Sequence, residues 1–477
     1  MISDALGELK PIARLAAPLI VAFFGYQLIG LVDTFVSGQL GVEVLAATSL
    51  ANALFWVITI FPMGMLMGLD PIVAQALGAG RPRRAWLACR DGIFMALVLS
   101  LITVPLLWYA ALPGWPWSPE GSLSDSLLDY MSGRIYCAPL LFVHTCVRCF
   151  LQSHERGGLI LLGTALSNVL NLFLSVYLGG GDLLLARFGL PELGWLESGY
   201  GAFGVGLASS IVLSIEVVLL TWRARQIGLE TSSVDLESLP TSDLSKIPMM
   251  EGWRELARVG APVGGSMLSE GGVFSASTLI VSAWSPIVIG AHQVTLQLAS
   301  MTFIISLGVA NATAVRVGQA VGAEDWARAR GAGLIGIIFS LLVMCSSALC
   351  FLFMGASLAG LITQNHEVIK LATELLLIAA AFQLFDGIQV TAAAALRGAG
   401  FTKIPLYSAM FSHWGVGLPI ALGLAFYAEM GVHGLWWGLC GGLISASLIL
   451  TSQFFSLTRP IAQGHPLNPN QKPQSLP

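Results

Sequence analysis

The sequence predicts an all-α integral membrane protein with twelve transmembrane helices in two six-helix lobes, related by a pseudo-two-fold axis along the membrane normal. The chain has 477 residues, of which 55% are hydrophobic and only 10% are charged. Soluble domains carry about 25% charged residues, so this composition is typical of a membrane protein. Apolar runs of about 20 residues, long enough to span a bilayer, recur along the whole chain.

A duplicated motif divides these runs into two sets. The segment Gln75-Ala76-Leu77-Gly78-Ala79 recurs as Gln319-Ala320-Val321-Gly322-Ala323, and Ala17-Pro18 recurs as Ala261-Pro262. The offset is the same for both, because 319 − 75 and 261 − 17 both equal 244. Internal repeats of this kind are typical of secondary transporters. Six helices per copy is an even number, so both copies are expected to insert with the same topology.

The expected helices follow from the apolar segments, several of which are longer than a bilayer requires. These segments are 12–38, 46–77, 86–112, 127–152, 158–180, 199–222, 255–284, 287–319, 329–362, 367–395, 404–428 and 432–458. The longest polar stretch, 226–253, is expected to be a cytoplasmic linker between an N-terminal lobe, 1–225, and a C-terminal lobe, 254–460. The polar, proline-rich end of the chain, 461–477, is expected to be a disordered cytoplasmic tail.

The basic residues indicate how the chain is oriented. Of the 23 Lys and Arg residues, all but Arg134, Arg187 and Lys370, that is 23 − 3 = 20, lie in the N-terminal region and in every second connection after it. Cytoplasmic connections carry an excess of Lys and Arg, so both termini are expected in the cytoplasm. An even number of helices requires the termini to share one side, which agrees.

Three carboxylates lie inside apolar helices: Asp33 in the first, Glu270 in the seventh and Asp386 in the tenth. No Lys or Arg lies within a helical turn or two of them in the sequence, so we expect them to be unpaired. Charge inside a membrane is costly, and such residues are functional candidates by default. Desolvation disfavours the charged form, which suits a group that takes up a proton or holds Na⁺. The structural alternative is a polar group that hydrogen-bonds a kinked backbone.

The three carboxylates also break the internal symmetry of the chain. At the offset of 244, none of their counterparts is ionised at neutral pH. The pairs are Asp33 with Ser277, Glu270 with Tyr26, and Asp386 with Phe142. Symmetric positions serve packing and insertion, so asymmetric charges are the better candidates for function.

Amides and prolines inside the helices are weaker candidates. Asn168 and Asn171 are i, i+3 on the fifth helix, where an amide either bonds to a neighbouring helix or faces a cavity. Pro18 and Pro262 lie early in the first and seventh helices and permit kinks. Bending there would couple protonation of a carboxylate to the shape of a cavity. Close helix packing through the nearby glycines is the alternative explanation.

Other polar residues in the apolar segments are expected to be structural. Glu216 lies in the middle of the sixth helix, two turns before Arg223, and is expected to pack or to snorkel. His144 is expected to be a hydrogen-bonded filler. No Walker-type phosphate loop and no His-Glu-x-x-His helix is present, and no nucleophile–base pair stands out. The sequence therefore does not indicate an enzyme.

Four segments together resemble one transporter family: Pro62 through Arg81, Ala291-His292-Gln293, Arg316 through Gln319, and Phe382 through Gly398. Over roughly residues 10–460 the chain resembles the multidrug and toxic compound extrusion (MATE) family, in its bacterial NorM-like branch. The resemblance implies twelve helices in two lobes and a central cavity open to one side at a time. It also implies export of cationic or amphipathic organic compounds in exchange for Na⁺ or H⁺.

The resemblance assigns roles to individual residues. Glu270 and Asp386 match the second-lobe cation site of NorM-like members and would hold Na⁺ or a proton. Asp33 matches an aspartate linked to proton-driven bending at a proline, here Pro18. Polar support of the substrate cavity is implied for Asn168, Asn171, Gln293 and Gln389, and a hinge for Pro18 and Pro262. Asp70 departs from the family pattern, which has a neutral residue before Pro71.

The implied partners are small organic cations and the lipid bilayer, without a nucleic acid or a resident cofactor. We expect a monomer in the bacterial inner membrane, coupled to either Na⁺ or H⁺. The main alternative is a lipid-linked oligosaccharide or metabolite flippase of related architecture. Such a flippase would line its cavity with Lys or Arg, whereas 20 of the 23 basic residues are expected at the cytoplasmic side. A passive channel would not need asymmetric buried carboxylates.

Overall fold

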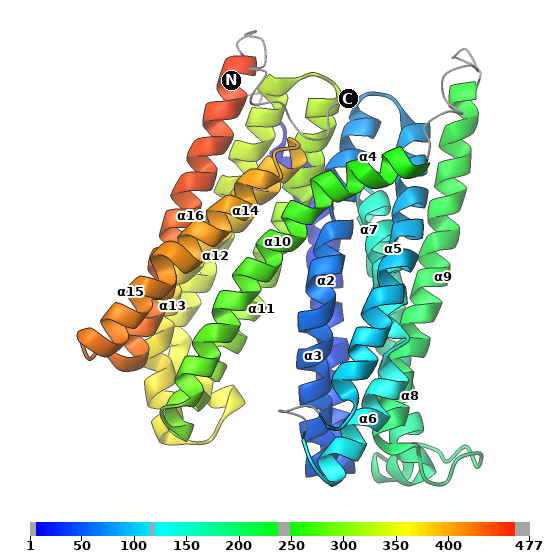
Figure 1. The fold of residues 1–477 in the computed structure, drawn as a ribbon, viewed down its shortest axis with the longest axis vertical. Helices are drawn as coiled ribbons and strands as arrows, with labels where there is room; N and C mark the ends of the chain where they lie inside the picture. The colour runs from blue at the N-terminus through cyan, green and yellow to red at the C-terminus, as the bar shows by residue number, and fades with distance from the viewer. Residues whose placement is uncertain (1–5, 115–118, 237–248, 463–477) are drawn as a thin grey trace. The chain divides into compact units, whose positions relative to one another are not determined.

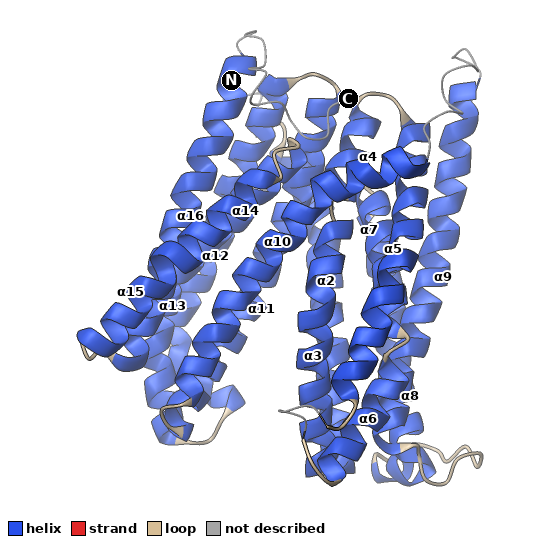
Figure 2. Ribbon diagram, in the orientation of Figure 1, coloured by secondary structure: helices blue, strands red, loops and turns tan. Residues whose placement is uncertain are grey.

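The computed structural model describes residues 6–114, 119–236 and 249–462. All regular structure in this part of the chain is helical, and no strand occurs in it (Figure 2). Residues 237–248 of the expected linker and 463–477 of the expected tail lie outside the described residues, as do Trp115 and Trp117.

The helices follow the apolar segments closely (Figure 1). They are α2 (Leu9–Leu40), α3 (Val42–Leu66), α4 (Leu69–Gly78), α5 (Pro82–Ala111), α6 (Ser122–Arg134), α7 (Cys137–Ser153), α8 (Gly157–Arg187), α9 (Gly201–Leu236), α10 (Met249–Ser282), α11 (Pro286–Gly322), α12 (Trp326–Ile362), α13 (His366–Gly398), α14 (Lys403–Ala409), α15 (Leu418–Leu422) and α16 (Gly431–Ala462). Two π-helical turns, η1 (Met410–Gly417) and η2 (Gly423–Tyr427), flank α15.

Each of the twelve expected segments is therefore helical, which confirms the all-α membrane class. In the described residues, ten helical stretches are long and apolar enough to span a membrane, or eleven if α6 and α7, bent by 40°, form one span. Helix α10 covers the remaining segment. Its central stretch carries Glu270 among glycines and serines, which lowers its mean hydropathy.

The chain forms two compact units. Unit 1 consists of Met1–Ile20, Asp70–Arg81 and Ala257–Pro477, and unit 2 of Val21–Leu69 and Pro82–Leu256. In unit 1, α11, α12, α13 and α16 pack together around the buried side chains of Phe351, Leu375 and Trp436. In unit 2, α3, α6 and α9 pack around Phe55, Tyr130 and Val205. Helices α2 and α10 contribute residues to both units.

Both copies of the duplicated motif end a helix in the same way. At the end of α4, Gly80 has a φ of 67°, and the N–H of Arg81 donates to the carbonyl of Ala76 over 2.9 Å. At the end of α11, Glu324 has a φ of 60°, and the N–H of Asp325 makes the corresponding bond over 2.9 Å. This is the Schellman motif, which satisfies the last carbonyls of a helix. Glu324 adopts a backbone conformation that glycine prefers.

The two copies contact each other inside unit 1 through their glycines. A Cβ atom on Gly78 would lie 2.0 Å from the carbonyl oxygen of Gln319, and one on Gly322 would lie 2.0 Å from that of Gln75. Both obstacles are backbone, so no side chain at either position can be accommodated by a rotamer change. The side chain of Gln75 then donates to the carbonyl of Gly398 over 2.9 Å. The motif recurs because each copy supplies one half of a reciprocal contact.

Candidate functional site

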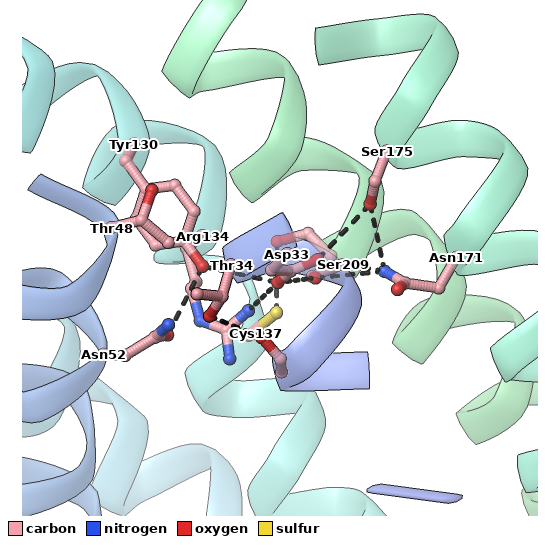
Figure 3. Close-up of polar contacts among 12 residues, drawn as sticks. Asp33, Thr34, Thr48, Asn52, Tyr130, Arg134, Cys137, Asn171, Ser175 and Ser209 are labelled. Atoms are coloured by element: carbon pink, nitrogen blue, oxygen red, sulfur yellow. Dashed lines mark hydrogen bonds and ion pairs between the residues drawn. The ribbon is translucent and has the colours of Figure 1, made fainter. Parts of the chain in front are cut away.

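The first candidate site surrounds Asp33 in unit 2 (Figure 3). Asp33 lies on α2 and its side chain is fully buried. The last residue of α6, Arg134, places Nη1 3.0 Å from Asp33 Oδ2. The prediction of an unpaired carboxyl is therefore wrong for Asp33. The cation lies on another helix, and a search one or two turns along α2 does not reach it.

Four further side chains donate hydrogen bonds to Asp33. They are Ser209 over 2.6 Å, Asn171 over 3.3 Å, Ser175 over 3.3 Å and Tyr130 over 3.3 Å. They come from α6, α8 and α9. An ionised carboxylate accepts hydrogen bonds and donates none, so this set of donors favours the charged form of Asp33.

Arg134 is itself held in place by aromatic rings. Its guanidinium carbon lies 5.3 Å from the centroid of the Phe55 ring and 5.8 Å from that of Tyr130. A guanidinium within about 6 Å of a ring face is attracted by the ring quadrupole. The Asp33–Arg134 ion pair is thus fixed from both ends, and the site carries no net charge when Asp33 is ionised.

The two asparagines of α8 differ in what they contact. Asn171 is fully buried and donates to Asp33, as well as lying 3.3 Å from Ser175 and Ser209. Asn168 is partly buried and donates to the carbonyl of Thr164 in its own helix over 2.8 Å. The structure therefore brings Asn171, and not Asn168, to the Asp33 carboxylate.

The second candidate site is the Glu270–Asp386 pair in unit 1. Glu270 on α10 is partly buried, and Asp386 on α13 is 6% exposed. The two carboxyls are close enough for their charges to repel. Within the described residues, neither accepts a hydrogen bond or forms an ion pair. Glu270 also interacts electrostatically with the guanidinium of Arg397 and with the imidazole of His413.

A π-helical turn packs beside Glu270. The indole of Trp414 in η1 donates to the carbonyl of Ser269 over 3.0 Å, and the ring borders Gly272. His413, also in η1, is 2% exposed. π-Helical turns are rare and often mark functional sites. The sequence did not predict this turn, because its composition does not differ from that of an ordinary apolar helix.

The remaining predicted residues are dispersed. Gln293 on α11 is exposed, whereas Gln389 on α13 is buried, and its Oε1 has no hydrogen-bond partner in the described part of the chain. Pro18 and Pro262 lie inside α2 and α10. Asp70, the departure from the family pattern, interacts electrostatically with Arg397. An acidic residue before Pro71 therefore faces a basic one in unit 1.

The described residues contain no group of three or more His, Cys, Asp or Glu side chains that could together hold a metal ion. The Glu270–Asp386 pair offers two carboxyls, so an ion bound there would need further oxygen ligands.

One residue that the sequence did not single out is Gln383, one turn before Asp386. Its amide donates to the hydroxyl of Thr302 and to the carbonyl of Ala299 over 3.3 Å.

Similar proteins agree with this architecture. The sequence model of the MatE family matches residues 18–177 and 262–422. The two matches begin 262 − 18 = 244 residues apart, the offset of the internal repeat. A relative from Deinococcus radiodurans, "Probable multidrug resistance protein NorM", is 34% identical over 460 residues, which cover 95% of this chain and 96% of that protein. One from Aliivibrio fischeri, "Multidrug resistance protein NorM", is 30% identical and covers 95% of each chain.

Solved structures show the same fold. A eukaryotic MATE transporter superposes with a TM-score of 0.78 at 19% identity, covering 97% of this chain and 99% of that one. An outward-facing multidrug resistance MATE family transporter superposes with a TM-score of 0.80 at 17% identity, covering 96% and 97%. Because the family model matches both halves and these relatives extend over nearly the whole chain, the protein belongs to the MATE family of membrane transporters.

Proposed function

We propose that this protein is a multidrug efflux antiporter, which exports cationic or amphipathic organic compounds in exchange for Na⁺ or H⁺ by alternating access. The observation that carries the proposal is the Glu270–Asp386 pair, two carboxyls inside membrane helices whose charges repel and which have no ion-pair partner in the described chain. Such a pair favours binding of a cation, because the cation removes the repulsion. The multidrug resistance names of the relatives support the substrate class.

Exchange follows if substrate and ion compete for the same negative charge. A cationic substrate is held while Glu270 and Asp386 are ionised. When Na⁺ or H⁺ neutralises the pair, that attraction is lost and the substrate leaves. Asp33 acts as a second titrating site. A proton on its carboxyl would break the ion pair with Arg134, and α2 would lose this contact with α6. Pro18 and Pro262 would let α2 and α10 bend as these groups titrate.

The same reasoning makes a flippase for pyrophosphate-linked lipids the weaker proposal. Arg134, one of the few basic residues expected away from the cytoplasmic side, is already bound by Asp33 over 3.0 Å. The orientation that fits the distribution of basic residues has both termini in the cytoplasm of a bacterial inner membrane. The proposed working form is a monomer built of an N-terminal lobe, 1–225, and a C-terminal lobe, 254–460.

Reconstitution into liposomes tests the proposal. Efflux of a fluorescent organic cation is measured with a Na⁺ gradient alone and with a pH gradient alone, for wild type, Glu270→Gln, Asp386→Asn and Asp33→Asn. Loss of ion-driven efflux in Glu270→Gln and Asp386→Asn is expected, and the effective gradient names the ion. Glu374→Gln is the matched control, because Glu374 lies on α13 with a 44% exposed side chain that contacts His433.

Two results would contradict the proposal. Full ion-driven efflux in Glu270→Gln would show that the pair does not couple transport. No efflux by folded wild-type protein under either gradient would point to a lipid or metabolite substrate.

A further inference from the structure

Unit 2 contains a buried carboxylate inside a membrane helix, Glu216, that the proposed exchange does not use. Glu216 on α9 is 2% exposed and His144 on α7 is 4% exposed. His144 Nε2 lies 3.4 Å from Glu216 Oε1. The expected roles, packing for Glu216 and a filler for His144, leave this contact unexplained, because an acid and an imidazole in contact inside a membrane share a proton readily.

Hydroxyl groups complete the surroundings of Glu216. Ser167 donates to Oε2 over 2.7 Å, and Thr164 donates to Oε1 over 3.1 Å. The phenol of Tyr26 lies 3.3 Å from Oε1 and 3.1 Å from Nε2 of His144. Tyr26 therefore bridges the acid and the imidazole. It also occupies the repeat position of Glu270, since 270 − 244 = 26.

The charged groups around the His144–Glu216 pair give a neutral cluster, to which one proton can be added. Arg148 follows His144 by one helical turn, is 7% exposed and lies over the ring of Phe23. With Arg148 charged and Glu216 ionised, the cluster is neutral when His144 is neutral. A single added proton gives one net positive charge, whether it sits on nitrogen or on oxygen.

In the described part of the chain, no other charged side chain makes a hydrogen bond or ion pair with His144 or Glu216. Helix α2 contributes the phenol of Tyr26, and α8 contributes the hydroxyls of Thr164 and Ser167. The proton-binding groups are thus His144 and Glu216 alone.

We propose that the His144–Glu216 pair is a proton-binding site in the first half of the chain, next to Tyr26, which occupies the repeat position of Glu270. The inference rests on the proposed antiport and adds to it a proton site besides the Glu270–Asp386 pair and Asp33. The proton binds to the lone pair of His144 Nε2 and leaves from the same atom, so only an N–H bond forms and breaks.

Proton binding at His144 affects helix α2 through the hydrogen bond of the Tyr26 hydroxyl. With Nε2 unprotonated, the phenol donates to the imidazole. With Nε2 protonated, the imidazole donates to Glu216, and the phenol turns to donate to Glu216 as well. Tyr26 precedes Asp33 by 33 − 26 = 7 residues, which is about two helical turns. A proton at His144 therefore changes a contact of the helix that carries Asp33.

Proton counting tests the site without relying on transport. Full-length protein in weakly buffered detergent is titrated between about pH 5 and about pH 8, the range in which histidine changes charge. We expect His144→Gln to bind about one proton fewer than wild type over this range. His292→Gln is the control, because His292 is equally buried but contacts the hydroxyl of Thr278 and no carboxylate. Equal proton counts for wild type and His144→Gln would overturn the inference.

A second measurement covers the case in which His144→Gln does not fold. In histidine-labelled protein, the ring signal that moves in Tyr26→Phe identifies His144, since that change removes the phenol and leaves both titrating groups. The inference requires this signal to shift between about pH 5 and about pH 8, and a signal that stays fixed overturns it.

Efflux in liposomes separates the two proposals. We expect His144→Gln and Tyr26→Phe to lower efflux driven by a pH gradient, while His292→Gln leaves it unchanged. Efflux that is ion-driven in wild type, with no change in proton count for His144→Gln, refutes the site and leaves the antiport standing. A lost proton in His144→Gln without ion-driven efflux in wild type refutes the antiport and leaves the site standing.

Discussion

Asp33 and Asp386 are the same residue type, each buried inside a membrane helix, yet their surroundings are opposite. Asp33 has an arginine partner, Arg134, and four further hydrogen-bond donors. Asp386 instead interacts with the charge of a second carboxylate, Glu270. The partners of Asp33 stabilise its ionised form against the cost of burial, whereas at Asp386 burial and a second negative charge both act against ionisation. Burial alone therefore does not determine whether a carboxylate inside the membrane can bind a cation.

The difference indicates two roles for carboxylates buried in the membrane helices. A compensated carboxylate keeps its charge and holds helices together until a proton displaces its partner. A carboxylate pair without a cationic partner is instead expected to bind a cation from solution.

Removing the partner of Asp33 is expected to have the largest effect. Arg134→Met leaves an ionised carboxylate buried and unpaired, which typically costs about 3–5 kcal/mol of unfolding free energy. Thermal unfolding in detergent measures the loss. A loss of this size in the unfolding free energy is expected only if Asp33 stays ionised after its partner is removed. The measured loss therefore tests whether Asp33 is charged in the folded protein.

The double variant Asp33→Asn with Arg134→Met is the control for this prediction. It removes both charges, so most of the lost stability is expected to return. A single Arg134→Met variant as stable as wild type would show that Asp33 does not depend on its arginine.

A compensated carboxylate in unit 1 should behave like Asp33, with a smaller effect. Glu8 precedes α2, and its Oε2 lies 2.7 Å from Arg316 Nε while its Oε1 lies 2.8 Å from Arg328 Nε. Burial acts to raise the pKa of Glu8, but the hydrogen bonds and charges of Arg316 and Arg328 outweigh it and hold the pKa below its ordinary value. Glu8→Gln is expected to lose about 2 kcal/mol near neutral pH, the typical value of hydrogen bonds to a charged group.

The sign of the pH dependence follows from the lowered pKa. The stabilisation is fully present above the ordinary pKa of a glutamate and is lost as pH falls through the folded value. The stability gap between wild type and Glu8→Gln should thus be constant above about pH 5 and shrink below about pH 4. Glu367→Gln, at an exposed position of α13, should show no such gap. A gap that widens in acid would reverse the assignment.

The two asparagines of α8 offer a matched pair. Asn171→Ala removes a buried donor to Asp33 and is expected to cost about 1–2 kcal/mol. Asn168→Ala removes a bond to its own helix backbone and should cost less than about 1 kcal/mol. Unfolding of both variants in one detergent measures the difference. Equal losses would mean that the Asp33 site gains nothing from Asn171.

The smallest effect on the unfolding free energy, which is either neutral or of opposite sign, belongs to Asp386. Asp386→Asn removes the repulsion with Glu270 and leaves a polar group of the same shape, so stability should stay the same or rise by up to about 1 kcal/mol. The same variant is expected to lose ion-driven efflux. A loss of stability as large as that of Arg134→Met would show that Asp386 has a cationic partner.

The helical membrane class, the twelve apolar segments, the internal repeat and the positions of Asp33, Glu270 and Asp386 could all be predicted from the sequence. These are local properties, because span length, hydropathy and a misplaced charge are all visible within some 20 residues of chain. The structure then gave the repeat a reason, since Gly78 and Gly322 each pack against the backbone of the other copy.

The tertiary structure alone decided which buried charges are compensated. Arg134 is 134 − 33 = 101 residues from Asp33, and His144 is 216 − 144 = 72 residues from Glu216. Which face of a membrane helix meets which neighbour depends on packing between apolar surfaces that differ little in composition. A charge inside a helix is therefore readable from sequence, whereas its partner becomes known only when the helices are packed together.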